Sequence, residues 1–265
     1  MARVDLPQSR LRARRKRMRT RLALVSLGAL ALLAAILVGL THLPFLQVYE
    51  VTVSGQKTLA SSTVAGYIHE QIAGYYLLVV PKRNIFIYPK RAIADGLLKQ
   101  FPELRAADVH ADDFHTIAAE LVEREPKALW CEGTRCFLMD QTGVVYAYTG
   151  GEDKFVSYRG ATEGESLPRQ YLAPDMFESL FALVDAVSQK LPDTPVEEVT
   201  VDSHQDGEAT LSNGFRLRFA LNDAGGDVFE RFTLALTSEP FLENDLSQFE
   251  YLDLRFGDKL YYKLK

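Results

Sequence analysis

Residues 22–43 read LALVSLGALALLAAILVGLTHL, an apolar stretch without a single Asp, Glu, Lys or Arg. About 20 predominantly apolar residues are enough for a helix to cross the hydrocarbon core of a bilayer. The stretch therefore predicts a transmembrane helix over residues 22–44. The residues before it and the residues after it are then expected to lie in different compartments.

The charges beside this helix predict its orientation. Residues 1–21 hold nine Lys and Arg side chains against one acid, Asp5. Positive charge stays on the cytoplasmic side of a membrane helix. We therefore expect a basic cytoplasmic tail over residues 1–21, a single pass through the plasma (inner) membrane and export of the remainder. A cleaved signal peptide is the alternative, but it would have a shorter apolar region and a small-residue cleavage site, which residues 41–44 (THLP) do not offer.

The charge is divided unevenly between the two sides. The formal net charge is −5 and the tail carries +8, so the remaining residues sum to −13. An acidic exported part repels phosphate, which argues against nucleic acid as the main ligand. The basic tail could bind nucleic acid or anionic lipid, but we interpret it as a topology signal in contact with the lipid membrane.

Residues 45–126 have the pattern of a small α+β domain. Alternating apolar side chains predict strands, and apolar residues spaced by four predict helices. We expect Ser61 or Ser62 to cap the first helix and Pro102 to end the second. The predicted elements are a strand over residues 48–53, helices from about residue 61 and over residues 90–101, and strands over residues 107–111 and 116–123. Helices on one side of a sheet would form this domain.

Residues 75–89 (YYLLVVPKRNIFIYP) are apolar, but Pro81 makes a continuous helix unfavourable. Two interpretations are open for this segment. It is either a buried connector packed on the domain, which we favour, or an apolar patch near the membrane surface.

Residues 127–265 predict a mainly antiparallel β domain with flanking helices. Its clearest helix covers residues 174–191, with Pro174 in the first turn. The other predicted elements are strands over residues 128–131, 136–140, 144–148, 155–158, 196–201 and 215–221, a turn over residues 222–226 and a helix over residues 228–238. Over residues 250–265 the apolar side chains share one parity that is interrupted at Gly257 and Asp258, which predicts two strand segments meeting there.

The chain has two cysteines, Cys131 and Cys136. Their spacing is too wide for a C-x-x-C redox motif. Across a tight hairpin they would lie nearly opposite each other, within disulfide reach, and export would place them where disulfides persist. We predict a structural disulfide, with two free thiols as the alternative.

Two polar clusters resemble chemical sites in composition. Residues 110–115 (HADDFH) gather two imidazoles and two carboxylates, but on either side of a solvated turn with no further ligand evident. Residues 202–206 (DSHQD) contain Ser, His and Asp, but catalytic triads are assembled from distant segments. The sequence has no G-x-S-x-G, H-E-x-x-H, P-loop or G-x-G-x-x-G motif. We predict no catalytic, metal or cofactor site, no small-molecule substrate and no enzymatic activity.

The terminal strand pattern predicts a binding site of another kind. An edge strand exposes unpaired N–H and C=O groups, to which a partner peptide can add as a further strand. Arg255 could then hold a partner carboxylate through two parallel hydrogen bonds. The alternative is that Arg255 lies on a solvated face without a binding role.

Four segments, in order along the chain, resemble the bacterial cell-division proteins of the FtsQ/DivIB family. They read YEVTVSG (residues 49–55), VEREPKALW (122–130), LMDQTGVVY (138–146) and LDLRFGDKLYY (252–262). The resemblance covers nearly the whole chain. It implies one membrane helix after a basic tail, a POTRA domain of strand-helix-helix-strand-strand order over residues 45–126, and a C-terminal β domain over residues 127–265.

The resemblance also implies a function. Members of the family are non-catalytic scaffolds of the divisome, the assembly that builds the septal wall, and they bind the small bitopic proteins FtsB (or DivIC) and FtsL through the last strands of the β domain. Carried onto this chain, the partner-binding residues are Asp253, Leu254, Arg255, Phe256, Gly257, Asp258 and Lys259, with Arg255 on the partner carboxylate. The alternative is a POTRA-containing transport or secretion component of the envelope, and a membrane-anchored hydrolase comes third.

Overall fold

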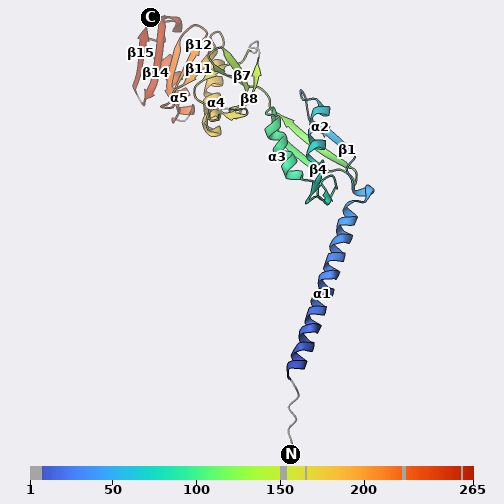
Figure 1. Ribbon diagram of the computed structural model, residues 1–265. Helices are drawn as coiled ribbons and strands as arrows, with labels where there is room; N and C mark the ends of the chain where they lie inside the picture. Colours follow the sequence, from blue (N-terminus) through green and yellow to red (C-terminus); the bar gives the residue numbers. More distant parts are fainter. Residues whose placement is uncertain (1–7, 150–153, 165, 223–224, 258) are drawn as a thin grey trace, which may run out of the picture. The chain divides into compact units, whose positions relative to one another are not determined.

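A computed structural model describes residues 8–149, 154–164, 166–222, 225–257 and 259–265, with side chains from residue 14 onward. The chain divides into two compact units (Figure 1). Unit 1 comprises Met1–Leu97 and Ala106–Leu121, and unit 2 comprises Leu98–Arg105 and Val122–Lys265. The protein has a mixed α+β fold with one N-terminal apolar helix and a large, mostly antiparallel sheet.

Unit 1 begins with the long helix α1 (Gln8–Thr41), drawn in blue in Figure 1. Its segment Arg14–Thr41 is long and apolar enough to span a membrane. The helix begins earlier than the predicted span of residues 22–44, because Arg, Lys, Leu and Ala favour helix and no Gly or Pro interrupts residues 8–27. It ends at Thr41, before the predicted end, and Pro44 then opens a short 3₁₀ turn, η1 (Pro44–Leu46).

The globular part of unit 1 contains a three-stranded sheet in the order β1-β5-β4. Strand β1 (Glu50–Ser54) runs parallel to β5 (Thr116–Glu123), which lies next to β4 (Leu104–Ala111). The helices α2 (Ser61–Gln71) and α3 (Lys90–Gln100) come between β1 and β4 in the sequence. Both helices and the sheet contribute fully buried side chains: Val64, Ile68, Ile93, Leu97, Val109, Ile117 and Ala119.

Two local predictions for unit 1 are wrong. Neither Ser61 nor Ser62 caps α2, because the helix already includes both serines and its N-cap is Ala60, without a side-chain hydrogen bond. Strand β1 begins at Glu50 rather than at Val48, whose backbone N–H donates to the Arg83 carbonyl oxygen instead, at 2.8 Å.

Residues 75–89 form the favoured buried connector only in part: Pro81, Asn84 and Ile85 are buried, but the residues before them are not. The segment contains a hairpin of two short strands, β2 (Tyr75–Tyr76) and β3 (Val80–Pro81). At its tip, Leu77 and Leu78 are 93% and 91% exposed. The Val79 N–H donates to the Tyr76 carbonyl oxygen and closes a tight turn, so the two leucines project from the unit without neighbours to bury them.

Unit 2 is built on a ten-stranded sheet, counted over the described residues, in the order β10-β8-β7-β6-β9-β11-β12-β13-β14-β15. Neighbouring strands are mostly antiparallel, but β9 runs parallel to β6 and β11, and β13 runs parallel to β14. The strands are β6 (Ala128–Glu132), β7 (Arg135–Met139), β8 (Val144–Thr149), β9 (Ser157–Arg159), β10 (Arg169–Gln170), β11 (Val196–Val201), β12 (Asp206–Leu211), β13 (Arg216–Ala220), β14 (Phe249–Phe256) and β15 (Lys259–Leu264). A short 3₁₀ turn, η2 (Leu246–Gln248), leads into β14.

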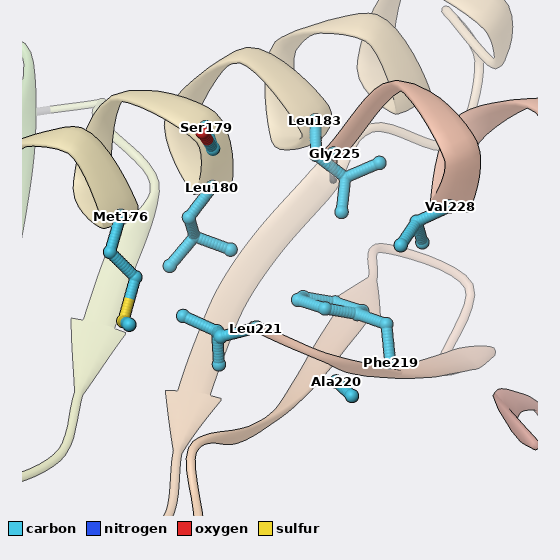
Figure 2. Close-up of a pocket in the computed structure, with 9 residues that line it drawn as sticks. All are labelled: Met176, Ser179, Leu180, Leu183, Phe219, Ala220, Leu221, Gly225 and Val228. Carbon is cyan, nitrogen blue, oxygen red and sulfur yellow. The ribbon is translucent and has the colours of Figure 1, made fainter. Parts of the chain in front are cut away.

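Two helices of unit 2, α4 (Pro174–Lys190) and α5 (Gly225–Leu236), bury their apolar faces in the main core. Figure 2 shows Met176 and Leu180 of α4 pointing toward the end of β13, where Phe219 and Leu221 lie. The space between them is a cavity of about 10 Å³, room for at most one water molecule. Because the helices bury apolar side chains against this face, the charged side chains of β12, β13 and β14 lie on the other face of the sheet.

Two predictions for unit 2 need correction. Strand β12 was not predicted, since residues 202–206 were interpreted only as a turn. The predicted turn over residues 222–226 includes residues 223 and 224, which lie outside the described residues, but Gly225 and Gly226 belong to α5, which thus begins before the predicted residue 228. A Cβ atom on Gly225 would lie 2.9 Å from the Ser179 carbonyl oxygen, so the close approach of α5 to α4 requires glycine here.

Candidate functional site

The last hairpin of unit 2 forms an open edge of the ten-stranded sheet. Strand β15 pairs with β14 on one side, with Leu252 opposite Tyr262 and Asp253 opposite Tyr261, and no described strand pairs with its other side. All six residues of β15 are exposed. Such an edge presents unpaired backbone N–H and C=O groups in the spacing that another strand needs.

Aromatic contacts hold β15 in place from both faces. The Tyr262 ring lies edge-on to the rings of Phe241 and Phe249, with centroids 5.5 and 5.9 Å apart. On the other face, Tyr261 meets Phe256 edge-on at 5.2 Å. The edge is therefore anchored to the core and still leaves apolar side chains accessible, which is the composition of a protein-binding surface.

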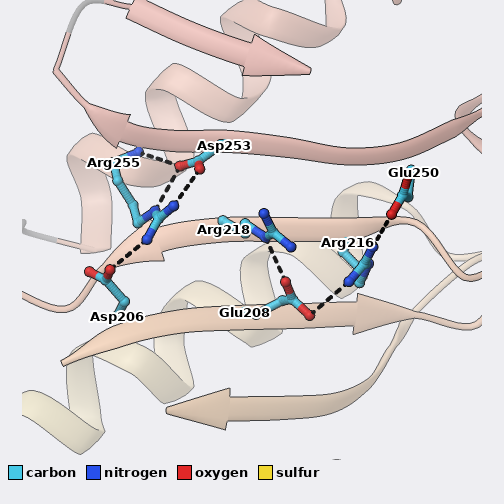
Figure 3. A network of polar contacts seen from close by, with 7 residues as sticks. All are labelled: Asp206, Glu208, Arg216, Arg218, Glu250, Asp253 and Arg255. Carbon is cyan, nitrogen blue, oxygen red and sulfur yellow. Dashed lines mark hydrogen bonds and ion pairs between the residues drawn. The ribbon is translucent and has the colours of Figure 1, made fainter. Parts of the chain in front are cut away.

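Arg255 lies at one end of a row of ion pairs on the sheet face opposite the helices (Figure 3). Its Nε and Nη2 atoms donate to the two carboxylate oxygens of Asp253 at 2.9 and 2.7 Å, and Nη1 donates to Asp206 at 2.6 Å. Three of the five N–H groups of the guanidinium thus bind carboxylates of the same chain.

A second group of ion pairs lies beside this one, across the same strands. Glu208 of β12 pairs with Arg218 at 2.6 Å and with Arg216 at 3.5 Å, both on β13, and Arg216 in turn donates to Glu250 of β14 at 2.6 Å (Figure 3). Lys263 of β15 reaches Glu250 at 2.6 Å. Charged side chains therefore link the four last strands of the sheet.

The ion pairs shift the pKa values of their members. Burial raises the pKa of Asp253, but hydrogen bonds from the side chain and backbone of Arg255 lower it more, so the net pKa lies below the ordinary value of an aspartate. A hydrogen bond from Lys263, and then the charge of Arg216, lower the pKa of Glu250. The pKa of Arg255 is raised by Asp253 and Asp206. All three groups are charged at neutral pH.

The predicted partner-binding residues do not share one environment. Leu254 is 1% exposed and belongs to the core, and Asp253 is 5% exposed beneath Arg255. Phe256, Gly257 and Lys259 lie on the surface at the hairpin, and Asp258 lies outside the described residues. The hairpin is supported by Arg231 of α5, whose Nη1 donates to the carbonyl oxygens of residues 254 and 257 at 3.0 and 3.2 Å.

Several residues of this edge escaped sequence reasoning. Asp206 and Glu208 stand on the strand that was not predicted, so their pairing with arginines of later strands had no signal in the sequence. Tyr261 and Tyr262 lie within the parity pattern of residues 250–265, and that pattern could have identified them as part of the edge.

The two cysteines are joined. Cys131 of β6 and Cys136 of β7 are direct partners across the hairpin, with Cα atoms 4.1 Å apart, and form a disulfide. The bond staples one hairpin of the sheet and leaves no free cysteine.

The two polar clusters are local structure. Asp113 accepts hydrogen bonds from the backbone N–H groups of residues 115 and 116, and Asp202 accepts from those of residues 204 and 206. These bonds lower the pKa of both aspartates and define ordinary turns. Within the described ranges, no group of three or more His, Cys, Asp or Glu side chains could hold a metal ion.

Comparison with known proteins does not assign the chain: no protein-family model matches it, and neither does any curated protein sequence.

Proposed function

We propose that this protein is a non-catalytic bitopic scaffold of the bacterial divisome, of the FtsQ/DivIB type. In this proposal α1 spans the plasma membrane with its basic end in the cytoplasm, residues 45–126 form a POTRA domain, and residues 127–265 present the binding surface outside the cell at the division septum. The order of β1, α2, α3, β4 and β5 supports the POTRA assignment, because it is the strand-helix-helix-strand-strand order that the resemblance implies.

The observation that carries the proposal is the open, apolar edge of β15. A partner strand can pair with its free backbone groups and cover Leu260, Tyr261 and Leu264. The expected partners are bitopic division proteins of the FtsB (or DivIC) and FtsL type. Addition of one strand requires no catalytic group, which agrees with a scaffold.

Arg255 contributes to this edge in a different way from the one first expected. Because it already binds Asp253 and Asp206, its main role is to fix β14 at the start of the hairpin. Its remaining N–H groups can meet a partner carboxylate at the exposed side of the network, since about a third of the side chain is accessible (30%).

A fluorescent protein fused to the cytoplasmic tail tests the proposal in dividing cells of the source bacterium. We expect a band at mid-cell that appears before constriction. The same fusion carrying Tyr261→Lys on β15 should still reach the membrane but recover less FtsB-type partner in a pull-down, whereas the control Tyr148→Lys should recover as much as the natural chain. An even signal around the envelope throughout division would contradict the divisome role and favour a transport or secretion component.

A further inference from the structure

The exposed apolar side chains of unit 1 are concentrated at one place. Outside α1, those described as large and exposed fall in four short segments: residues 45–49, residues 75–79, residues 86–87 and Phe114. Val122, at the end of β5, is also exposed but belongs to unit 2. We name these four segments the apolar belt. Exposed apolar residues scattered singly need no explanation, whereas a contiguous group marks a surface that is covered in use.

The first three segments of the belt adjoin the end of α1. Residues 45–49 follow the helix directly, and the Val79 carbonyl oxygen accepts a hydrogen bond from His42 Nε2 at 2.7 Å. Asn84, two residues before Phe86, donates its side-chain N–H to the Thr41 carbonyl oxygen at 3.0 Å. The belt therefore surrounds the point at which the membrane-spanning helix would leave the bilayer.

Phe114 closes the belt on its remaining side. Its ring lies edge-on to Phe86 at 6.4 Å, and the next residue, His115, accepts a backbone hydrogen bond from Tyr49 at 2.9 Å. Asp112 and Asp113 precede Phe114 and favour water. In any contact with an apolar phase, the hairpin of β2 and β3 would therefore lie deeper than this loop.

The tip of the hairpin has two features that are energetically unfavourable on a protein surface in water. Leu77 and Leu78 are almost fully exposed, and both have positive φ angles, 47° and 67°. Two successive residues with positive φ in a tight turn normally include Asn and Gly, because a Cβ atom and a branched side chain are strained there. A strained backbone that carries exposed apolar groups points to a function of the tip.

The groups around the tip match the interfacial region of a bilayer. Tyr75 and Tyr76 are aromatic residues of the kind enriched at that depth, and Lys82 and Arg83 supply positive charge for lipid phosphates. A cleft of about 440 Å³ lies beside them, lined by His42, Gln47, Tyr49, Tyr75 and Arg83 among others. Arg83 is held over the Tyr49 ring at 5.5 Å, so a cation and apolar rings share this surface.

We propose that the apolar belt rests on the outer surface of the bilayer that α1 spans, with the turn formed by Leu77 and Leu78 entering the boundary between headgroups and acyl chains. The occupant of this surface is lipid. The inference rests on the part of the proposed function in which α1 crosses the membrane, and it is independent of any role in division. It assigns unit 1 a second contact with the membrane, which restricts how the unit can tilt about the end of α1.

Tryptophan quenching in vesicles tests this contact. The full chain is reconstituted into phosphatidylethanolamine and phosphatidylglycerol vesicles whose acyl chains carry bromine near the headgroup, and the emission of the native Trp130 in the unmodified chain is subtracted. We expect Leu78→Trp to emit at shorter wavelength and to be quenched several-fold more strongly than the control Ser62→Trp. Ser62 is exposed on the first turn of α2, which follows the end of β1 remote from α1.

A third position separates the failure of the span from the failure of the belt. Leu30→Trp lies within α1, and in parallel vesicles whose acyl chains carry bromine near the bilayer centre it reports insertion of the helix. Quenching at residue 30 together with an unquenched, water-like emission at residue 78 would overturn the proposal and leave a protein partner as the occupant of the belt. Equal quenching at residues 62 and 78 would also overturn it, because unit 1 would then lie on the membrane without using the belt.

A variant with the residues that the turn prefers tests the two leucines without destabilising the hairpin. Replacing Leu77 with Asn and Leu78 with Gly supplies the residues that the turn prefers, so the hairpin is expected to fold at least as well. With Phe86→Trp as the reporter, this double substitution should lower quenching by brominated lipid, because the tip no longer holds the belt at the interface. Unchanged quenching of the reporter would contradict the role of the two leucines.

Discussion

At the scale of single residues, the pairing of Arg255 with Asp253 stands out because one partner is almost fully buried. A carboxylate removed from water is stable only when hydrogen-bond donors and positive charge surround it. Asp253 receives donors from both the side chain and the backbone N–H of Arg255. The arginine is thus needed for the stability of unit 2, whatever it does for a partner.

Arg255→Ala is expected to lower the free energy of unfolding of unit 2 by about 2 kcal/mol, because it removes charge-assisted hydrogen bonds and leaves Asp253 buried without its cation. Urea unfolding of the full chain in detergent, followed by the fluorescence of Trp130, measures this. The control is Arg135→Ala. Arg135 is exposed, and its Nη2 atom lies 3.8 Å from Oε2 of the equally exposed Glu132. Because exposed ion pairs contribute little, this substitution should change the free energy of unfolding by less than about 0.5 kcal/mol. Equal losses in both variants would refute the special position of Arg255.

The same pair predicts a dependence on pH. The folded-state pKa of Asp253 lies below its ordinary value of 3.8. Its contribution to stability is therefore complete above that value and is lost as the pH falls through the folded-state pKa. Unfolding at a series of acid pH values should show a steeper loss of stability for the natural chain than for Arg255→Ala, and parallel curves would contradict the assignment.

At the scale of secondary-structure elements, β15 combines an unpaired backbone with accessible aromatic side chains. Natural proteins commonly protect a sheet edge with charge, proline or a covering helix. Here two lysines, Lys259 and Lys263, give partial protection, and Lys263 is drawn toward Glu250 by an ion pair. The edge is therefore protected only in part and remains open to one further strand.

Tyr261→Lys is expected to weaken binding of an FtsB- or DivIC-type partner by about tenfold or more, since aromatic side chains at the centre of an interface contribute most of its energy. Calorimetric titration of the purified proteins in detergent measures the affinity. Tyr148→Lys is a closely matched control: both tyrosines are exposed, on strands, and edge-on to one phenylalanine each. Weakening by the control as well would locate the binding surface elsewhere.

Sequence patterns predicted those elements whose periodicity is regular. The helix over residues 174–191 and the break at Gly257 were visible because apolar spacing and proline or glycine positions agree there. Strand β12 was missed because its residues, DGEATL, have Asp206 and Glu208 on the face that carries the ion pairs, and these acids resemble a turn until arginines on later strands neutralise them.

The candidate site was less accessible to prediction than the fold. The sequence indicated an edge near Arg255, but it could not show that two acids of the same chain already occupy the guanidinium. For residues 75–89, apolar composition suggested burial, whereas the short hairpin leaves its tip exposed. The partners of Arg255 depend on pairing between distant strands, and the exposure of the hairpin tip depends on turn geometry. Neither can be read from the local sequence pattern.

At the scale of the whole molecule, the chain consists of an apolar helix and two compact units with separate cores. The disulfide lies entirely within unit 2, between neighbouring strands. Its effect on stability should therefore be confined to that unit, which allows the independence of the two units to be measured.

Scanning calorimetry of the full chain in detergent should show two transitions. Reductant, or replacement of Cys131 and Cys136 by Ser, is expected to lower the free energy of unfolding of unit 2 by about 2 kcal/mol, from the entropy of a small closed loop. Only the transition that Trp130 fluorescence assigns to unit 2 should then move to lower temperature. The substituted protein should not respond to reductant. A shift of both transitions would show that the units unfold as one.

The parallel pairing of β13 with β14 has a consequence for biogenesis. Parallel neighbours require a crossover connection, and the connection between β13 and β14 contains α5, which packs against α4. We therefore expect the final hairpin to complete the sheet together with that helix. A half-folded copy would then lack the finished edge of β15. If a partner adds to β15, as proposed, it would bind completely folded copies in preference to incomplete ones.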